Sequence, residues 1–598
     1  MSIDDVTDAD APSIGTAGDD VPAGGAEAAG DSAAVDVPNS DSGRDDGDGG
    51  PTDETATPTG PRRGRRIAGY LVTVLSFLLV AFALTAQNRL SSLTPEAFVR
   101  IPLEGIIGLA LVLVLPARLR GVVVAVAGAL LGLLTIIKIV DMGFFETLSR
   151  PWDPVLDWTF VSDGLEFLNT STGRVGEIGV VVVVITLAIA LPIVMANSAL
   201  RLSRIAVRHR AIATGALVTL TAAWVALALR GTQLVPGVPV ASRSAAGLAY
   251  GNALQAHKAL RDKKEFFAAN AVDQFRDTPG TQLLTGLRGK DVLLAFVESY
   301  GRTAAEDPQV DSMLDAGTQQ LKAAGFSSES AWLTSSTYGG GSWLAHSTVQ
   351  SGVWINNQQR YNDLVKSDRL TLSGAFRRAD WRTVAVMPGL TRAWPEGGFY
   401  GYDKIYGDKD MGYQGLPFSW ATMPDQYALE AFQRAERSSP NHTPVMAEIP
   451  LVSSHAPWAP IPSLIDWNAV GDGSIFATQA KNGQSAAAIW RDSDRVRAEY
   501  KRSIEYTVST LVSYVKKYGD KNLVLVFLGD HQPIPLVSGE GASRDVPITI
   551  VAKDPAVLKQ ISGWGWQDGI KPAPRSPVWP MSAFRDKFLT AFGSTPSK

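Results

Sequence analysis

The stretch that decides the fold is Val292-Leu-Leu-Ala-Phe-Val-Glu-Ser-Tyr-Gly301, in which six apolar residues are followed directly by a glutamate. A second stretch has the same form, Leu523-Val-Leu-Val-Phe-Leu-Gly-Asp-His-Gln-Pro533, with an aspartate and a histidine after the apolar run. Unbroken apolar runs of this length are typical of strands that are buried on both faces of a sheet. Both stretches therefore predict a central strand with polar side chains at its carboxyl end.

Three further runs have the strand pattern, namely Thr383–Met387, Val445–Val452 and Val546–Ala552. Across residues 290–598 the five runs alternate with helical stretches, which predicts an α/β domain with a mostly parallel sheet covered by helices. Ligands of such sheets bind outside the carboxyl ends of the strands. The residues that directly follow the strands are therefore the first candidates for a functional site.

Glu298, Asp530 and His531 lie just past two of these strands and supply two carboxylates and an imidazole. This mixture of donors suits a divalent metal ion, Mn²⁺ or, as the alternative, Zn²⁺. A single carboxylate at a strand end is more often a cap or an ion-pair partner. The combination favours a metal site, because the chain has only six histidines and two of them, His455 and His531, follow strand ends.

A candidate nucleophile lies in the glycine-rich segment Thr337-Tyr-Gly-Gly-Gly-Ser-Trp-Leu-Ala-His346, which leads into a helical stretch. Ser342 is expected at the N-terminus of that helix, where the helix dipole and free N–H groups favour an anionic oxygen. A neighbouring metal ion would lower the pKa of its hydroxyl further. The alternative is that Ser342 only caps the helix. His346, one turn later, either supports the site or simply packs beneath it.

The composition of the 598-residue chain excludes several classes of protein. It contains no cysteine, which excludes disulfide scaffolds, thiolate metal sites and sulfatases whose nucleophile is an oxidised cysteine. Residues 1–61 hold 13 Asp, 2 Glu and one Arg, a net charge of -14, so the rest of the chain carries +10 of the overall -4. This tail has too little apolar surface to fold and is expected to be disordered. Nucleic-acid binding is not indicated.

Five apolar runs follow the tail: Ile67–Gln87, Ile101–Pro116, Gly121–Val140, Ile178–Asn197 and Ala211–Leu229. The second is short and contains Glu104, so taken alone it also fits an interfacial or re-entrant segment. If all five span a bilayer, the loops carry ten arginines on one side and four on the other. That asymmetry predicts a multi-pass protein of the cell membrane with its N-terminus in the cytoplasm and everything after Leu229 outside. Buried helices of a soluble protein are the less favoured alternative.

The chain is therefore expected to have four parts. Residues 1–61 form the acidic cytoplasmic tail, residues 62–230 a transmembrane domain with five helices, and residues 290–598 the extracytoplasmic catalytic domain. Residues 231–289 form a linker that begins with Val235-Pro-Gly-Val-Pro239. The charged, amphipathic stretch Ala245–Phe275 in this linker predicts a helix near the membrane surface.

Several motifs together resemble the lipoteichoic acid synthase and phosphoglycerol transferase branch of the alkaline phosphatase (sulfatase-like) superfamily. They are Val297–Gly301, the glycine-rich segment with Ser342, Ser454-His-Ala-Pro-Trp458, Gly401-Tyr-Asp-Lys404 and Gly529-Asp-His-Gln-Pro533. The resemblance extends to the five membrane helices before the catalytic domain. It implies that Glu298, Ser342, Asp530 and His531 hold one metal, that Ser342 is the nucleophile and that His455 meets the substrate phosphate.

The sequence departs from this family at three places. Ser342 stands where the family has threonine, which keeps the hydroxyl and removes a methyl group. Pro388-Gly389 replaces the family's His-Gly. Trp394 matches a tryptophan that contacts the phosphoglycerol head group, but the arginine that follows it in the family is Glu396 here, and Arg392 is the candidate replacement. The head-group contacts are therefore less well supported by the resemblance than the metal ligands and the nucleophile.

These features predict a membrane-anchored, metal-dependent phospho-alcohol transferase, of the phosphoglycerol type, that acts on a membrane phospholipid through a covalent Ser342 intermediate. The acceptor would be a cell-envelope polymer, a glycan or a glycolipid. The alternatives are a sulfatase-like phosphodiesterase with water as the acceptor, a phosphoethanolamine transferase, and an inactive protein that binds the envelope. The inactive protein would be expected to have lost a metal ligand, and none is missing.

Overall fold

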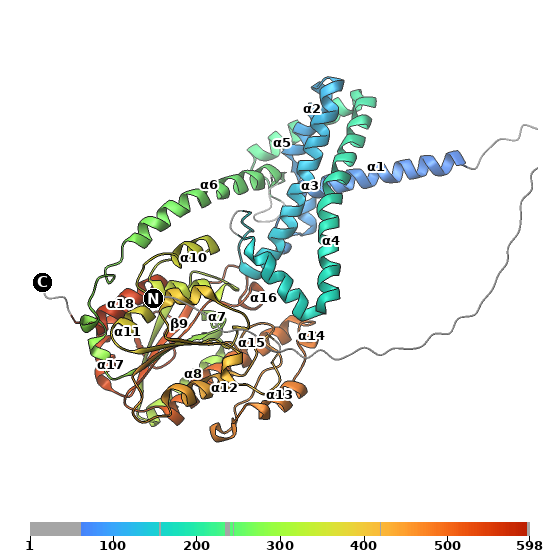
Figure 1. Ribbon diagram of the computed structural model, residues 1–598. Coiled ribbons are helices and arrows are strands. Elements are labelled where there is room, and N and C mark those ends of the chain that lie inside the picture. Colours follow the sequence, from blue (N-terminus) through green and yellow to red (C-terminus); the bar gives the residue numbers. More distant parts are fainter. Residues whose placement is uncertain (1–60, 155–156, 234–239, 243, 419, 595–598) are drawn as a thin grey trace, which may run out of the picture. The chain divides into compact units, whose positions relative to one another are not determined.

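The computed structural model describes residues 61–154, 157–233, 240–242, 244–418 and 420–594 (Figure 1). The tail predicted at residues 1–61, apart from its last residue, and the segment Val235–Pro239 lie outside the described residues. Residues Arg66–Lys598 form one compact unit. The boundaries between membrane domain, linker and catalytic domain that we place at residues 230 and 289 remain a prediction.

Four helical segments in the described part are long and apolar enough to cross a membrane: Arg65–Thr85 in α1 (Pro61–Thr85), α3 (Ala117–Leu148), Arg174–Arg208 in α4 (Thr159–Arg208) and α5 (Arg210–Leu229). Most of their apolar side chains are exposed in the protein alone. An exposed apolar surface of this extent is typical of a region that contacts a membrane or another protein. The predicted span Ile101–Pro116 contains α2 (Leu103–Val114), which has only 12 residues, so the fifth span stays a prediction.

Helices α3 and α4 pack closely through glycine. A Cβ atom on Gly132 would lie 2.6 Å from Cα of Pro192, and one on Gly128 would lie 2.8 Å from Cα of Ala196. Both distances are shorter than van der Waals contact, so a side chain at either position would force the helices apart. Small residues four apart are a common means of helix association in membranes, where no hydrophobic effect drives the contact.

The predicted amphipathic stretch forms α6 (Ser244–Ala271). Just before it, β2 (Ala241–Ser242) pairs in parallel with β1 (Ile101–Pro102) in a two-stranded sheet. The end of the linker is fixed by ion pairs, since Asp273 accepts hydrogen bonds from the fully buried Arg585.

The C-terminal part of the chain is built on a nine-stranded sheet with the order β10-β4-β9-β8-β3-β7-β5-β6, and β11 lies beside β4. Its strands are β3 (Asp291–Val297), β4 (Ser327–Thr334), β5 (Arg382–Val386), β6 (Lys404–Tyr406), β7 (Val445–Leu451), β8 (Leu523–Gly529), β9 (Asp545–Ala552), β10 (Gln567–Asp568) and β11 (Val578–Pro580). Strands β8, β3, β7, β5 and β6 are parallel, whereas β9 runs antiparallel to both β8 and β4. All five predicted strands are present, and the expected mostly parallel sheet has this antiparallel insertion.

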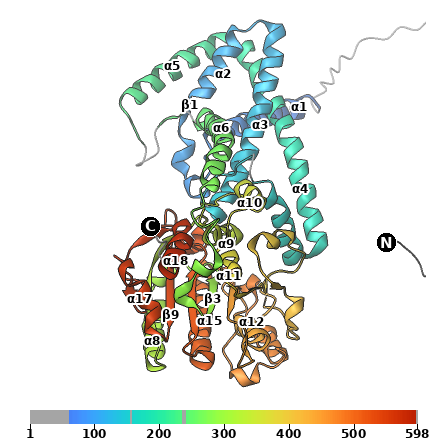
Figure 2. The same ribbon diagram turned by 60° about the vertical axis from the view of Figure 1, so that its left-hand side comes forward.

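Helices cover both faces of the sheet (Figures 1 and 2). One face packs against α8 (Pro308–Ala323), α12 (Asp425–Phe432) and α15 (Ser493–Tyr518), and the other against α9 (Ser342–Ser351), α11 (Leu372–Arg378), α17 (Pro555–Gln560) and α18 (Phe584–Phe592). Alternate residues of β3 enter the two cores, as Leu293 and Leu294 illustrate, because side chains alternate across a strand. This double burial explains the unbroken apolar run.

Candidate metal centre and nucleophile

The sheet itself brings Glu298 and Asp530 together. Strands β3 and β8 are parallel neighbours, and Val297 lies opposite Gly529 at their carboxyl ends. The next residues, Glu298 and Asp530, therefore leave the sheet side by side. The backbone N–H of Ser299, which has a left-handed φ of 56°, donates to Oδ1 of Asp530 over 2.8 Å. One loop thus fixes the carboxylate at the end of the other.

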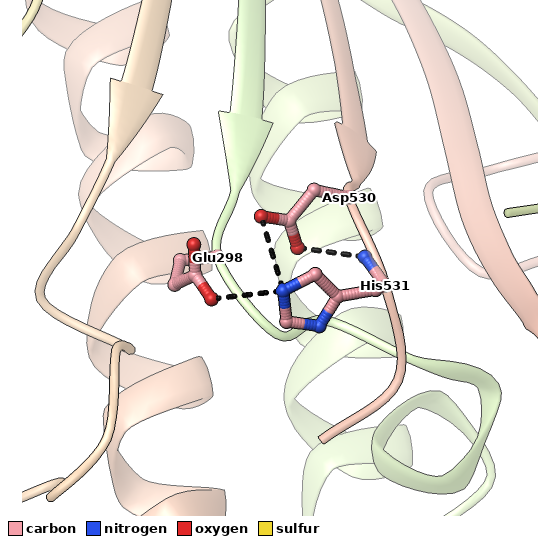
Figure 3. Close-up of side chains that lie close together, drawn as sticks. All are labelled: Glu298, Asp530 and His531. Carbon is pink, nitrogen blue, oxygen red and sulfur yellow. Dashed lines mark hydrogen bonds and ion pairs between the residues drawn. The ribbon is translucent and has the colours of Figure 1, made fainter. Parts of the chain in front are cut away.

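His531 completes a cluster in which one ligand atom each from Glu298, Asp530 and His531 lies within 4.8 Å of the others (Figure 3). Its Nε2 is 3.3 Å from Oε1 of Glu298 and 3.8 Å from Oδ2 of Asp530. Its Nδ1 is 2.8 Å from the carbonyl oxygen of Gln532, which can only accept, so Nδ1 carries a hydrogen. That tautomer turns the metal-binding nitrogen toward the carboxylates, the usual arrangement of a ligating histidine.

Ser342 reaches the same cluster from the first residue of α9. Its Oγ donates a hydrogen bond of 2.8 Å to Oε2 of Glu298 and lies 3.2 Å from Nε2 of His531. The helix cap is Gly341, in the left-handed conformation with φ of 77°, and no side chain caps this helix. The alternative in which Ser342 only caps a helix is therefore wrong. Glycine takes the cap position and leaves the hydroxyl free to face the carboxylate.

The three groups shift one another's pKa. Burial would raise the pKa of Glu298, but the charge and the hydrogen bond of His531 outweigh burial and hold that pKa well below its usual range. Burial, and then the charge of Glu298, raise the pKa of Asp530 well above its usual range. Burial would lower the pKa of His531, but the charges of Asp530 and Glu298 raise it to about 9. Without a cation, burial therefore disfavours the ionised form of Asp530.

The cluster fits a divalent metal ion. Two carboxylates, one imidazole nitrogen and one hydroxyl oxygen converge on one point, and they are the donor types that Zn²⁺ and Mn²⁺ accept. A bound cation would displace the proton of His531 Nε2, because metal binding is linked to deprotonation of the ligands. It would also neutralise the negative charge of the two neighbouring carboxylates. Glu298, Ser342, Asp530 and His531 are the residues that would hold it.

His455 lies next to this cluster on the loop after β7. Ser454 fixes the loop, because its Oγ donates to the carbonyl oxygen of Glu298 over 2.7 Å. The half-buried imidazole of His455 stacks on Trp420 with ring centres 3.8 Å apart. Sequence reasoning missed this stacking partner, because it stands 35 residues away on another loop.

The two predicted head-group residues lie on the segment between β5 and β6. Trp394 donates from Nε1 to the hydroxyl of Tyr361 over 3.2 Å and packs against Tyr400. The hydroxyls of Tyr400 and Ser347, on α9, are 2.7 Å apart, which links Trp394 to the helix that carries Ser342. Arg392 is exposed. Among the described residues, Trp394 makes no hydrogen bond to a metal ligand. The role of Trp394 and Arg392 in head-group binding stays a prediction.

A buried polar network beneath the site was missed by sequence reasoning. It centres on Glu448 of β7, whose Oε2 accepts hydrogen bonds from the hydroxyl of Tyr402, over 2.6 Å, and from Nε2 of Gln350. Burial raises the pKa of Glu448 to about 7. His346 lies between this carboxyl and Asp530. The single acidic residue in the apolar run Val445–Leu451 was the available signal.

In sequence, the chain matches neither a protein family nor a curated protein. In structure, it is similar to the lipoteichoic acid synthase LtaP from Listeria monocytogenes, with 16% identity over 52% of this chain and 74% of that chain and a TM-score of 0.35. It is similar to the lipooligosaccharide phosphoethanolamine transferase EptA, an integral membrane protein from Neisseria meningitidis, with 12% identity over 87% of this chain and 95% of that chain and a TM-score of 0.41. It is also similar to the phosphoglycerol transferase GacH from Streptococcus pyogenes, with 14% identity over 56% of this chain and 91% of that chain and a TM-score of 0.32. Similarity at this level carries neither a substrate nor a reaction to this chain.

Proposed function

We propose that this protein is a membrane-anchored, metal-dependent phospho-alcohol transferase that uses Ser342 as a covalent nucleophile. The observation that carries the proposal is the position of the Ser342 hydroxyl, 2.8 Å from Oε2 of Glu298 and 3.2 Å from Nε2 of His531. A serine that neither caps its helix nor faces solvent alone, but points into a group of metal-binding side chains, has the geometry of an activated nucleophile.

The first step is attack by Oγ of Ser342 on the phosphorus of a phospholipid head group. The hydroxyl hydrogen, which is hydrogen-bonded to Glu298 in this structure, passes to water as the new P–O bond forms. The P–O bond to diacylglycerol breaks, and the departing oxygen takes up a proton from water. A divalent ion held by Glu298, Asp530 and His531 would supply the positive charge that favours the serine alkoxide and offsets charge on the phosphate.

In the second step an acceptor hydroxyl attacks the same phosphorus. The bond to Ser342 breaks, the serine oxygen regains a proton, and the acceptor hydroxyl loses one, so that the phospho-alcohol passes to the acceptor. His455 is positioned beside the cluster to stabilise charge on the phosphoryl oxygens. Trp394 and Arg392 are the residues we assign to the alcohol part of the head group.

The long apolar helical segments fit a donor substrate that lies in a membrane. The four long apolar helical segments hold the catalytic residues at a bilayer, and a phospholipid does not leave that bilayer. We propose phosphatidylglycerol as the donor, a cell-envelope polymer, glycan or glycolipid as the acceptor, and Mn²⁺ or Zn²⁺ as the ion. The arginine asymmetry of the loops supports a cytoplasmic N-terminus and an extracytoplasmic catalytic domain.

Mass spectrometry of the full-length protein tests the proposal. The protein, loaded with Mn²⁺ or Zn²⁺, is mixed with vesicles of phosphatidylglycerol or of phosphatidylethanolamine, and its peptides are sequenced. We expect a phosphoglycerol adduct on Ser342, and none on Ser342→Ala. An adduct with the mass of phosphoethanolamine would change the donor and keep the mechanism. A metal-loaded protein that cleaves phospholipid without any adduct on Ser342 would refute the covalent mechanism.

A further inference from the structure

His346 occupies a position that the proposed reaction does not yet use. It lies on α9 one turn after Ser342, and its imidazole stacks on Phe296 of β3 with ring centres 3.9 Å apart. Its two nitrogens face two different carboxyl groups. Nδ1 is 3.6 Å from Oε1 of Glu448, and Nε2 is 3.9 Å from Oδ2 of Asp530.

The Nε2 atom of His346 is buried and has no hydrogen-bond partner among the described residues. Leaving a buried polar atom unpaired costs free energy, so such atoms in a native fold call for a specific reason. The group that this nitrogen faces is a metal ligand. Oδ1 of Asp530 is already held by the backbone N–H groups of Ser299 and His531, over 2.8 and 2.7 Å. Oδ2 is the oxygen left for the metal, and His346 stands beside it.

Glu448 fixes the other side of the ring. Its Oε2 is occupied by Tyr402 and Gln350, so Oε1 is the oxygen that remains for Nδ1 of His346. Gln350 also accepts a backbone hydrogen bond from Ser373, over 3.0 Å. The carboxyl group of Glu448 is therefore held from several elements, and the imidazole lies between an anchored acid and a metal ligand.

We propose that His346 is a positioning residue of the metal centre, which orients the Oδ2 atom of Asp530 through Nε2 and is itself oriented by Glu448. The inference rests on the metal centre of the proposed function. The competing explanation is that His346 only fills space against Phe296. The two explanations differ in what they require at the position of Nε2, a hydrogen-bond donor in one case and a ring of the same size in the other.

Two substitutions separate these explanations. His346→Phe keeps a ring against Phe296 and removes both nitrogens. His346→Gln gives up the ring and keeps an N–H donor close to the position of Nε2. His442→Phe is the matched control, because His442 pairs with Asp291 at the amino end of β3. Each full-length variant is titrated with Zn²⁺ and with Mn²⁺ by calorimetry, and its metal-free melting temperature is recorded.

We expect His346→Phe to fold and to bind the metal about 10- to 100-fold more weakly than the wild type, the usual loss when a residue that supports a ligand is removed. His346→Gln should recover most of the affinity in spite of a lower melting temperature, and His442→Phe should bind as the wild type does. Glu448→Gln should weaken binding in the same direction as His346→Phe.

Wild-type metal affinity in His346→Phe would overturn the inference and leave His346 with a packing role. If that variant does not fold, His346→Leu replaces it, and equal affinities of the leucine and glutamine variants would overturn the inference in the same way. Absence of metal binding by the wild type would instead refute the metal centre itself, and with it this role for His346. The failure of the proposed function is thus distinguishable from the failure of this inference.

Discussion

Asp530→Asn should make the metal-free protein more stable, although it destroys the site. Asparagine has the shape of aspartate and keeps the Oδ1 atom that accepts from the N–H groups of Ser299 and His531. What it removes is charge. The ionised form of Asp530 is disfavoured in the metal-free site, because burial, and then the charge of Glu298, raise the pKa of Asp530 well above its usual range.

The magnitude follows from the charges around Asp530 and from its burial. The ligand atoms of the two carboxylates lie within 4.8 Å, and at an effective dielectric constant of about 20 two like charges at that distance repel by about 3.5 kcal/mol. The variant also loses the attraction between Asp530 and the imidazolium of His531, whose Nε2 is 3.8 Å from Oδ2, which is about 4 kcal/mol. Because these two interactions nearly cancel, the gain comes from no longer burying an ionisable carboxyl group, and we expect the variant to gain roughly 1–3 kcal/mol over the wild type without metal.

With metal bound, the wild type should be more stable than Asp530→Asn. A wild-type protein at a free metal concentration of about 100 times its Kd gains about 2.7 kcal/mol, whereas a variant that has lost a charged ligand gains little. Thermal unfolding of both purified full-length proteins, after chelation and after addition of Zn²⁺ or Mn²⁺, measures the two differences. Asp425→Asn is the matched control, since Asp425 is equally buried but belongs to a network with Thr507 and Ser453. It should respond to metal as the wild type does.

Two results would refute this reasoning. If metal-free Asp530→Asn melts below the wild type, burial does not disfavour the charge of Asp530 and the cluster is an ordinary hydrogen-bonded network. If the variant gains as much stability from metal as the wild type, the ion binds elsewhere.

Three further outcomes are expected. Ser342→Ala should lose turnover and the covalent adduct, whereas Ser342→Thr should retain activity. In the metal-free protein, Ser342→Ala should also lower the free energy of unfolding by about 1.5–3 kcal/mol, because a hydrogen bond to a buried carboxylate is lost. An alanine variant that turns over at the wild-type rate would remove Ser342 from the mechanism. Burial raises the pKa of Glu448 from 4.5 to about 7, so its carboxyl group stays protonated to a higher pH in the folded state than in the unfolded state. About 3 kcal/mol of stability should therefore be lost as the pH rises from about 4.5 to about 7. The free energy of unfolding is measured at about pH 5 and at about pH 8, and Glu448→Gln should remove this loss of stability between them. An unchanged pH dependence in the variant would contradict the prediction for Glu448. A reporter fused after Lys598 should be active outside the cell and one at the N-terminus only inside, and the opposite result would overturn the topology.

The centre of the fold was predictable because its signal is local. Strands β3 and β8 are continuous apolar runs, and each ends at a residue with metal-binding chemistry. Once both are parallel strands of one sheet, the register that sets Val297 opposite Gly529 brings Glu298 and Asp530 together. The sequence contained both the strands and the ligands.

Other features of the sheet, namely strand β4 and the direction of β9, were harder to predict from the sequence. Strand β4, Ser-Ser-Glu-Ser-Ala-Trp-Leu-Thr, begins with four polar residues, and it is a strand because it pairs along its full length with β9. That pairing depends on tertiary context, which intrinsic β-propensity does not determine. The antiparallel direction of β9 has the same origin, since an apolar run shows where a strand is but not which way it points.

In the candidate site, too, residues that the sheet positions were easier to predict than residues on loops. Glu298, Asp530 and His531 leave strand ends, and Ser342 begins a helix that packs on the sheet, so the sheet fixes all four and their meeting follows from the fold. Trp394, Arg392 and Trp420 stand on loops whose course no strand dictates, and their positions depend on contacts with residues far away in sequence, such as the stacking of Trp420 on His455. In the function we propose, the strand ends of the sheet therefore fix the metal ligands and the nucleophile, while the loops above them would select the alcohol that is transferred. For this reason, substitutions in the metal cluster should abolish transfer of every head group, whereas substitutions in the loops should change which head group is transferred.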